Sequence, residues 1–247
     1  MNKPPRAEDA EAEAEAVAQR YARRNASDLY SALRPEVYLG LQERQRAMLR
    51  GFAARGCSDL GSLHIAEVGC GTGGNLLELL RLGAEPAHLT GLELLPERHA
   101  AARHVLPAAT TLWLGDAMQA PADVLAPASQ DVLLQSTVFS SLLDDNFQQR
   151  LADQMWAWLK PGGVVLWYDF TVNNPRNRDV RGVPLARVRQ LFPQGRVEAS
   201  RVTLAPPLAR RVCRWHPAFY SLFNSLPLLR THVLAWVDKP AVAARAR

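Results

Sequence analysis

Lysine and cysteine are both scarce in this 247-residue chain. Only three lysines contribute to the formal net charge of +5, so the basic character comes almost wholly from arginine. Arginine forms bidentate pairs with phosphate and carboxylate groups, but it is also the basic residue that a GC-rich genome supplies by default. The three cysteines, Cys57, Cys70 and Cys213, have neither pairing nor metal-ligand spacing, which argues against a disulfide framework and favours a reducing compartment.

Long hydrophobic runs are missing as well. No apolar stretch approaches the roughly 20 residues of a membrane-spanning helix, and the N-terminal stretch MNKPPRAEDAEAEAEAVAQR lacks the apolar core of a secretion signal. With 48% hydrophobic and 21% charged residues, the composition is that of a folded globular protein rather than a disordered one. We therefore expect a bacterial, cytoplasmic protein, and the scattered histidines predict no metal centre.

Short apolar runs alternate with helical patterns along most of the chain, after a polar segment over residues 1–15 that is expected to fray. The expected strands cover residues 63–68, 88–95, 111–118, 131–136, 164–170, 196–204 and 231–239. The expected helices cover residues 16–34, 36–55, 74–82, 96–105, 146–159 and 184–192. This alternation predicts an α/β fold with a doubly wound, seven-stranded, mostly parallel sheet. We expect an N-terminal helical cap over 1–58 and a catalytic domain over 59–247, with a lid-like helical insertion at 206–230.

A glycine-rich loop, IAEVGCGTGG, follows the first expected strand. Gly69, Gly71 and Gly73 allow a tight turn and let the backbone approach a ligand closely. The helix that starts near Gly74 offers unpaired N–H groups to an anionic group. In a doubly wound sheet this is the edge where ligands bind, so the loop predicts a site for a charged, nucleotide-like molecule.

Three acidic residues stand at the ends of three successive strands. Glu67 precedes the first glycine, where its carboxylate can accept from an ammonium group but would repel a pyrophosphate. Glu93 can accept from two ribose hydroxyls, although a nicotinamide dinucleotide site also has an acid there. Asp116 is placed to accept from an exocyclic adenine amine. Together they predict a ligand with an ammonium, a ribose diol and an adenine.

The ordered motifs EVGCGTG, GLELLP, GDA, DVLLQS and LKPGG resemble those of class I S-adenosylmethionine-dependent methyltransferases over roughly residues 60 to 170. The resemblance implies S-adenosyl-L-methionine as the cofactor and a transferase activity. The implied cofactor-binding residues are Glu67, Gly69, Cys70, Gly71, Gly73 and Asn75 around the methionine portion, Glu93 at the ribose, Leu94, Asp116 and Ala117 at the adenine, and Ser136 near the sulfonium. The family usually has aspartate where Glu93 stands, and the longer side chain is compatible with the same contact.

A general base is harder to predict. Many relatives place a histidine shortly after the fourth strand, but this chain has STVFSSLLDD there. Asp169, at the end of the fifth strand, is the candidate catalytic residue, and the alternative is that it caps the following loop. His216, in the insertion, is a weaker candidate because a surface histidine is the simpler interpretation.

Acceptor binding is predicted from position. The polar loop over 170–184 follows the fifth strand directly, and its Asn173 and Arg176 are candidate substrate-binding residues. Tyr30, with Tyr38 and Arg44, is expected to close over the cofactor from the N-terminal helices. The insertion at 206–230 mixes arginines with aromatic residues, so it either packs as a lid or makes a peripheral membrane contact.

The resulting hypothesis is methyl transfer to a small or medium-sized acceptor, at oxygen, in a metabolite, a saccharide or a lipid-linked substrate. An rRNA or tRNA methyltransferase is the first alternative, favoured by the positive charge but opposed by the lack of a lysine-rich patch and of an appended RNA-binding module. A nicotinamide-dependent oxidoreductase is opposed by Glu67 and Asp116. A non-catalytic subunit that keeps the fold is opposed by the three intact acids.

Overall fold

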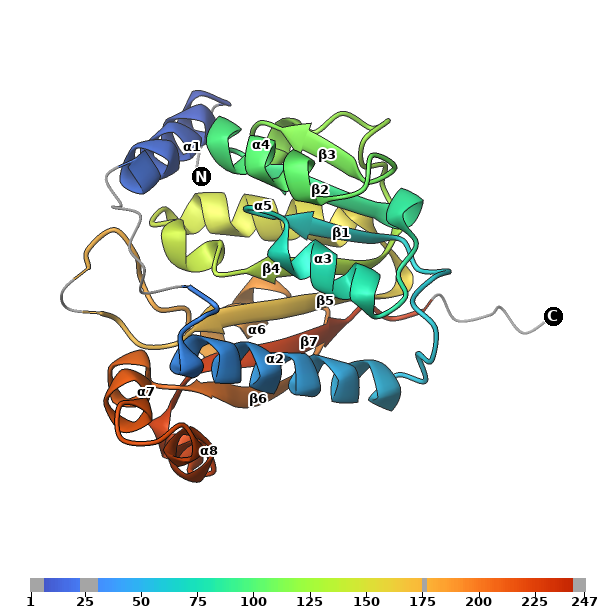
Figure 1. The fold of residues 1–247 in the computed structure, drawn as a ribbon. Coiled ribbons are helices and arrows are strands. Elements are labelled where there is room, and N and C mark those ends of the chain that lie inside the picture. Colours follow the sequence, from blue (N-terminus) through green and yellow to red (C-terminus); the bar gives the residue numbers. More distant parts are fainter. Residues whose placement is uncertain (1–6, 23–30, 175–176, 242–247) are drawn as a thin grey trace.

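A seven-stranded sheet runs through the centre of the protein (Figure 1). The computed structural model describes residues 7–22, 31–174 and 177–241. The strands are β1 Ile65–Val68, β2 Leu89–Glu93, β3 Thr111–Leu114, β4 Gln130–Ser136, β5 Leu159–Phe170, β6 Arg196–Leu204 and β7 Arg230–Asp238. Their order is β3-β2-β1-β4-β5-β7-β6, with β1 to β5 parallel and β7 antiparallel to both its neighbours. The predicted doubly wound, mostly parallel sheet is confirmed.

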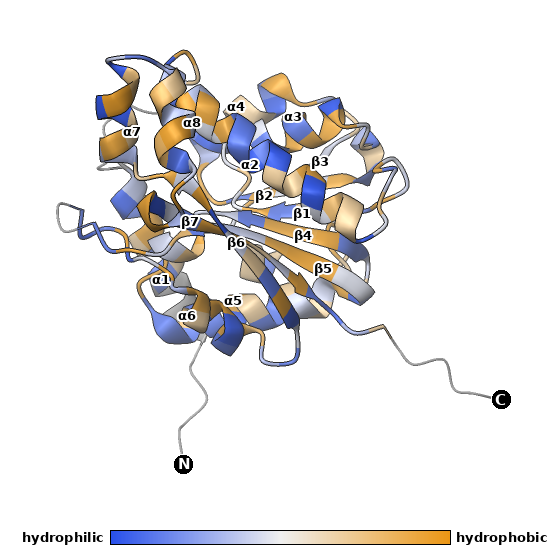
Figure 2. Cartoon of the chain, turned by 90° about the horizontal axis from the view of Figure 1, so that it is seen from below, coloured by the Kyte–Doolittle hydropathy of each residue, from blue (hydrophilic) through white to orange (hydrophobic). Residues whose placement is uncertain are grey.

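Helices cover both faces of this sheet (Figures 1 and 2). The helices are α1 Ala7–Ala22, α2 Pro35–Ala54, α3 Gly74–Arg81, α4 Pro96–Val105, α5 Asp145–Trp158, α6 Leu185–Leu191, α7 Pro206–Cys213 and α8 Ala218–Asn224. Phe52 of α2 and Leu76 of α3 belong to the apolar core on one face, whereas Trp158 of α5 and Val188 of α6 belong to the core on the other. Both β1 and β2 are buried along their whole length, as expected of parallel strands covered on both sides.

The chain reverses direction in the sheet beside β1. From β1 it continues outward to β2 and β3, and then returns to β4 and β5 on the other side of β1. The loops after β1 and β4 therefore leave the same edge of the sheet in opposite directions, which opens a crevice between them. None of the described helices is long and apolar enough to cross a membrane.

Several boundaries differ from the sequence prediction: β3, for example, ends at Leu114 and not at residue 118, and the largest differences are at α1 and β5. Helix α1 begins at Ala7, inside the segment expected to fray, because alanine and glutamate are strong helix formers and tertiary contacts hold the helix: Glu13 Oε1 accepts from Leu143 N at 2.9 Å. Of the helix expected over 16–34, the structure describes the part up to Ala22; residues 23–30 lie outside the described ranges, and residues 31–34 are not helical. Strand β5 begins at Leu159, before the predicted start at 164.

The insertion between β6 and β7 folds into α7, α8 and a short 3₁₀ turn over Pro227–Leu229. It has its own apolar cluster, in which Val212 and Tyr220 pack against Leu204 at the end of β6. Helix α8 is joined to α2 because Tyr220 Oη donates to Glu43 Oε2 at 3.2 Å. The predicted helical insertion before the last strand is thus present, at one end of the sheet.

Helix α2 packs on the sheet through a glycine. An ideal Cβ at Gly51 would lie 2.2 Å from Trp236 Cε2 of β7, well inside any van der Waals distance. We expect Gly51→Ala to lower the free energy of unfolding by about 1–3 kcal/mol, since overpacking outweighs the gain of about 1 kcal/mol in helix propensity. Urea unfolding followed by circular dichroism measures the change. The exposed neighbour Arg50 provides the control, Arg50→Ala; an unchanged or raised midpoint in Gly51→Ala would contradict the packing.

Candidate active site

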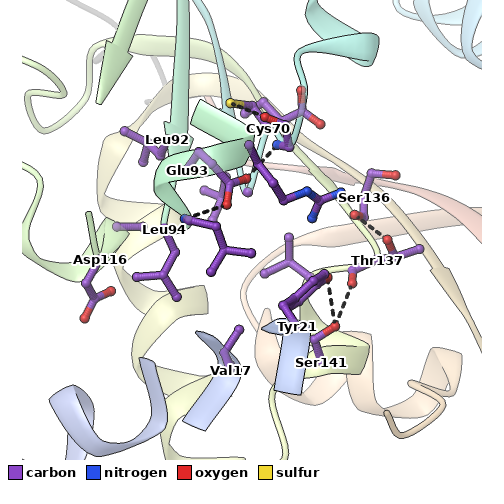
Figure 3. Close-up of a pocket in the computed structure, with 18 of the residues that line it drawn as sticks. Val17, Tyr21, Cys70, Leu92, Glu93, Leu94, Asp116, Ser136, Thr137 and Ser141 are labelled. Carbon is purple, nitrogen blue, oxygen red and sulfur yellow. Dashed lines mark hydrogen bonds between the residues drawn. The ribbon is translucent and has the colours of Figure 1, made fainter. Parts of the chain in front are cut away.

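A cavity of about 280 Å³ lies at the carboxyl ends of β1, β2 and β4. Figure 3 shows Val17 and Tyr21 of α1 facing the strand ends that carry Glu93 and Ser136. The cavity therefore has a floor of strand-end loops and a cover made by a helix from the N-terminal segment. This is the edge of the sheet at which the glycine loop predicts a ligand.

Most of the predicted cofactor-binding residues line this cavity. They are Glu67, Gly69, Cys70, Gly71, Asn75, Glu93, Leu94, Asp116, Ala117 and Ser136. Gly73 is the exception: it adopts a left-handed conformation with φ +84° at the start of α3, and a Cβ there would lie 2.9 Å from Leu106 Cδ1. Gly73 thus serves helix packing in the described structure. The contacts of all these residues with a cofactor remain predictions.

The glycine loop has the conformation that its sequence requires. Gly69 and Gly71 both have positive φ, +67° and +60°, a region that L residues with side chains rarely adopt. A Cβ at Gly69 would also lie 2.5 Å from Val138 Cγ2. The loop can therefore bring backbone atoms to the cavity surface only because these positions have no side chain.

Glu67 is completely buried at the end of β1. Asn75 Nδ2 donates to its Oε1 at 2.5 Å, while its Oε2 has no hydrogen-bond partner within the described chain. Burial raises the pKa of the Glu67 carboxyl to about 7, and the Asn75 hydrogen bond opposes that rise. A buried carboxylate oxygen without a donor is costly, and an ammonium group of a ligand would satisfy it. The residue fits the methionine end of S-adenosylmethionine.

Glu93 and Asp116 also have carboxylates at the cavity. Glu93 accepts from Gly71 N at 2.7 Å and from Leu95 N at 2.9 Å, one bond to each oxygen. Each oxygen can accept a second hydrogen bond, so the side chain is held in place without losing its capacity for a ribose diol. Asp116 Oδ1 accepts from Met118 N at 2.9 Å and caps the short turn after β3.

Two arginines approach these acids from helices. Arg44 of α2 donates to Asn75 Oδ1 at 2.6 Å and to Ser136 Oγ at 3.3 Å. Arg98 of α4 lines the cavity and lies over the ring of Tyr21, 5.1 Å from its centroid. The motif at the start of α4 carries no sign of this role for Arg98. Neither arginine forms an ion pair within the described parts of the chain. Arg98 lines the cavity, whereas Arg44 does not itself line it and hydrogen-bonds Asn75 and Ser136, two residues that do.

Helix α1 is tied across the mouth of the cavity. Arg20 Nη2 donates to Ser141 O at 3.0 Å, and Tyr21 Oη lies 3.3 Å from Ser141 Oγ. Tyr38, which was expected to close over the cofactor, is instead half exposed at a separate surface groove. The cover therefore comes from Val17 and Tyr21, which the sequence did not single out.

Asp169 does not face the cavity, contrary to the prediction from its place at the end of β5. It is fully buried, and its oxygens accept from Ser140 N at 3.0 Å and Phe170 N at 2.9 Å. Burial raises the pKa of Asp169 to about 7. These contacts match the alternative of a loop-capping carboxylate. His216 is exposed on the insertion and also lies away from the cavity.

Of the three predicted acceptor-binding residues, the structure describes only Asn173, which does not line the cavity. Asn173 is exposed, and its Oδ1 accepts from Gly182 N at 2.8 Å, which closes its own loop. Tyr30 and Arg176 lie outside the described residues. Their roles in acceptor binding therefore stay predictions.

The sequence of residues 65–163 matches the family model of the methyltransferase domain. This segment holds the glycine loop, all three strand-end acids and the strands β1 to β4. The chain carries a class I S-adenosylmethionine-dependent methyltransferase domain. With this assignment, the predictions of a methyltransferase and of S-adenosylmethionine as its cofactor are confirmed.

Solved structures share the fold of this methyltransferase domain at low identity. An S-adenosylmethionine-dependent methyltransferase from Archaeoglobus fulgidus matches with a TM-score of 0.56 and 13% identity, over 82% of this chain and 99% of that chain. Phosphoethanolamine N-methyltransferase 2 from Haemonchus contortus, in complex with S-adenosyl-L-methionine, matches with a TM-score of 0.55 and 17% identity, over 80% and 52%. The [4+2]-cyclase SpnF matches with a TM-score of 0.54 and 15% identity, over 80% and 82%. No curated protein matches the sequence.

Proposed function

We propose that this methyltransferase transfers a methyl group to an oxygen atom of a small or medium-sized acceptor, such as a metabolite, a saccharide or a lipid-linked substrate. The observation that supports a small acceptor is the cover of the cavity, because Val17 and Tyr21 of α1 lie over the strand ends at which the methyl group would stand. A folded RNA could reach these strand ends only by displacing α1 or by inserting a single flipped base.

The proposal assigns each end of the cofactor to residues of this chain. Glu67 holds the ammonium group, and Arg44, joined to Glu67 through Asn75, holds the carboxylate of the same amino acid. Glu93 accepts from the ribose hydroxyls. Asp116 and Ala117 meet the adenine edge, with Leu94 against the ring. When bound, the cofactor supplies an activated methyl group on a sulfonium, so the protein's main task is alignment.

Helix α1, which covers the cavity, supports both the alignment of the acceptor with the methyl group and the exclusion of water from the reaction. In favourable cases positioning alone lowers a barrier by about 7–11 kcal/mol. Tyr21 and Ser141 place two hydroxyl groups beside the end of β4, close to Ser136. These neutral groups can hydrogen-bond an acceptor hydroxyl and orient its oxygen.

The proposal also includes a cytoplasmic location. It is supported by the three cysteines, none of which forms a disulfide.

Incubation with S-adenosylmethionine labelled in its methyl group, together with a bacterial metabolite and glycan extract, tests the function. We expect label in a low-mass or saccharide fraction, in an ether linkage that resists alkaline hydrolysis. Label in the RNA fraction instead would favour the alternative of an RNA methyltransferase. SpnF shares the fold but is described as a cyclase, so the fold alone does not ensure methyl transfer. If the protein binds the cofactor but transfers no label, methyl transfer to these acceptors is rejected.

Removing the ribose contact should weaken cofactor binding. We expect Glu93→Ala to reduce the affinity for S-adenosylhomocysteine by about 1–3 kcal/mol, because two hydrogen bonds to a charged acceptor are lost. Isothermal titration calorimetry measures the effect. Glu97, which is exposed on α4, gives the matched control Glu97→Ala. Unchanged affinity in Glu93→Ala would remove the ribose assignment.

Cofactor binding should depend on pH through Glu67. Burial raises the pKa of Glu67 to about 7, and a bound ammonium would lower it again, so binding below pH 7 must release a proton. The affinity for S-adenosylhomocysteine is expected to fall about tenfold per unit below pH 7 and to stay level just above it. Titrations between pH 5.5 and 8 test this dependence, with Glu67→Gln as the variant in which the slope should vanish. A level profile in the natural protein would contradict an ammonium contact at Glu67.

A further inference from the structure

Large exposed apolar side chains gather on one end of the protein. They belong to the segment 31–39, which leads into α2, and to the insertion over 205–229; these two segments are here called the α7–α8 face. The exposed apolar residues on this face are Leu33, Tyr38, Trp215, Phe219, Leu222, Leu226 and Leu228. Elsewhere in the described chain such residues occur far apart in sequence: Leu49, Val105, Leu114 and Val172. Leu228 is 89% exposed and Trp215 is 77% exposed, and exposed apolar residues that gather in one place, unlike single ones, mark interaction surfaces.

The two segments form one continuous surface. Leu33, Tyr38 and Leu39 line a shallow groove together with Pro217, which precedes α8. In both ribbon views α7 and α8 stand together at a corner of the molecule, and Figure 2 shows apolar stretches on both helices. The face is also firmly attached, since Glu43 of α2 accepts from Tyr220 Oη at 3.2 Å and from Thr203 N at 2.9 Å. It is therefore preformed.

The charge of the α7–α8 face is positive. Its two segments contain four arginines and a single carboxylate, Glu36. Arg34 Nε pairs with Glu36 Oε1 at 2.9 Å. Arg211 and Arg214 are exposed and form no ion pair within the described residues. Apolar side chains thus stand beside unneutralised guanidinium groups.

We propose that the α7–α8 face docks on the surface of an anionic phospholipid bilayer. Aromatic and leucine side chains can enter the boundary between headgroups and acyl chains, while arginines attract anionic headgroups. A symmetric dimer through the same face is disfavoured, because the two-fold axis would bring the exposed arginines of both copies together. The inference concerns a surface outside the cofactor cavity, so it does not depend on the acceptor proposed above.

Sedimentation with vesicles tests this inference on the full chain. The protein is expected to pellet with vesicles of equal parts phosphatidylglycerol and phosphatidylcholine, and not with pure phosphatidylcholine, and high salt should release it. Trp215→Ser/Leu228→Ser and Arg211→Glu/Arg214→Glu should each weaken binding about tenfold or more. Leu49→Ser/Val105→Ser is the matched control, because it removes two exposed apolar residues outside the face.

Folding and alternative partners are controlled in the same set of proteins. Each variant should keep the affinity of the natural protein for S-adenosylhomocysteine, which lies in a separate cavity. On vesicles that include a brominated phosphatidylcholine, the tryptophan emission should shift to the blue and be partly quenched, and Trp215→Phe should remove this change. The inference is overturned if the natural protein does not pellet with anionic vesicles or binds neutral ones equally well. It is likewise overturned if either variant of the α7–α8 face pellets like the control variant. The same holds if the natural protein is a dimer in solution and the substitutions in the face convert it to a monomer.

Discussion

Gly71→Val is expected to abolish binding of S-adenosylhomocysteine. Gly71 lines the cavity and has φ +60°, where an L residue costs about 1–2 kcal/mol and a β-branched one more. An ideal Cβ there already lies 3.3 Å from Arg98 Nη2, and the two further methyl groups of valine would extend into the space proposed for the cofactor. The backbone strain at residue 71 and the filling of the cofactor space by valine both weaken cofactor binding. Calorimetric titration should show no heat of binding at ligand concentrations that saturate the natural protein.

The contribution of strain can be separated from that of occlusion. Gly56 has a similar φ of +69°, but a Cβ at that position would meet nothing within 4 Å, and the residue lies outside the cavity. Gly56→Val should therefore lose some stability while binding the cofactor normally. If Gly71→Val bound S-adenosylhomocysteine as the natural protein does, the glycine loop would not form the cofactor site.

Arg44→Ala is expected to weaken binding of S-adenosylhomocysteine by about 2–3 kcal/mol, or roughly 30- to 150-fold, because a charge-assisted contact with the amino acid carboxylate is lost. Arg44 Nη2 lies 2.6 Å from Asn75 Oδ1, and Asn75 in turn donates to Glu67. Burial raises the pKa of Glu67, and after the Asn75 hydrogen bond the positive charge of Arg44 is the next influence that lowers it. The guanidinium of Arg44 and the carboxylate of Glu67 thus both hydrogen-bond the amide of Asn75. Their opposite charges are placed to bind the carboxylate and the ammonium of an amino acid.

A truncated ligand makes this prediction specific. The thioether nucleoside 5′-methylthioadenosine has the adenine and the ribose but no amino acid, so its affinity should be the same for Arg44→Ala and the natural protein. Arg46, exposed on the same helix, supplies the control Arg46→Ala. Equal losses for both ligands would mean that Arg44 supports the fold of the site, through Ser136 and the Tyr168 ring on which it lies, and does not contact the amino acid.

The strand-end acids could be placed from sequence because of a simple geometric rule. In parallel strands the carboxyl ends share one edge of the sheet, so Glu67, Glu93 and Asp116 had to lie near one another once their strands were recognised. The glycines between them required a left-handed loop, and Gly69 and Gly71 have it. Only short-range information was needed for each of these inferences.

Residues that reach the site across the sheet could not be placed in the same way. Tyr21 lines the cavity because α1 lies over the edge of the sheet, held by Glu13 and Arg20, and no local motif encodes that position. Arg98 is similar. For such residues the determining contacts are separated by tens or more than a hundred positions in sequence.

Asp169 was misplaced because its face of β5 could not be assigned from the sequence. Side chains alternate between the two faces of a strand, so Trp167 and Asp169 of β5 share a face. Trp167 is buried in the core beneath Phe139, 4.5 Å between ring centroids, and Asp169 correspondingly turns toward the backbone of Ser140. Tyr168 points to the opposite face, toward Arg44. Alternation therefore placed Asp169 on the face of Trp167, but the sequence did not show which face of the sheet that was, because Tyr168 packs a second large side chain into the core on the other face.

A crystal structure with S-adenosylhomocysteine is the most direct test of the account. It should show the ligand in the cavity beneath α1, with its amine within hydrogen-bonding distance of Glu67, its ribose at Glu93 and its carboxylate directed past Asn75 to Arg44. A cavity without ligand, or a ligand whose amino acid end points away from the pair formed by Glu67 and Arg44, would contradict it.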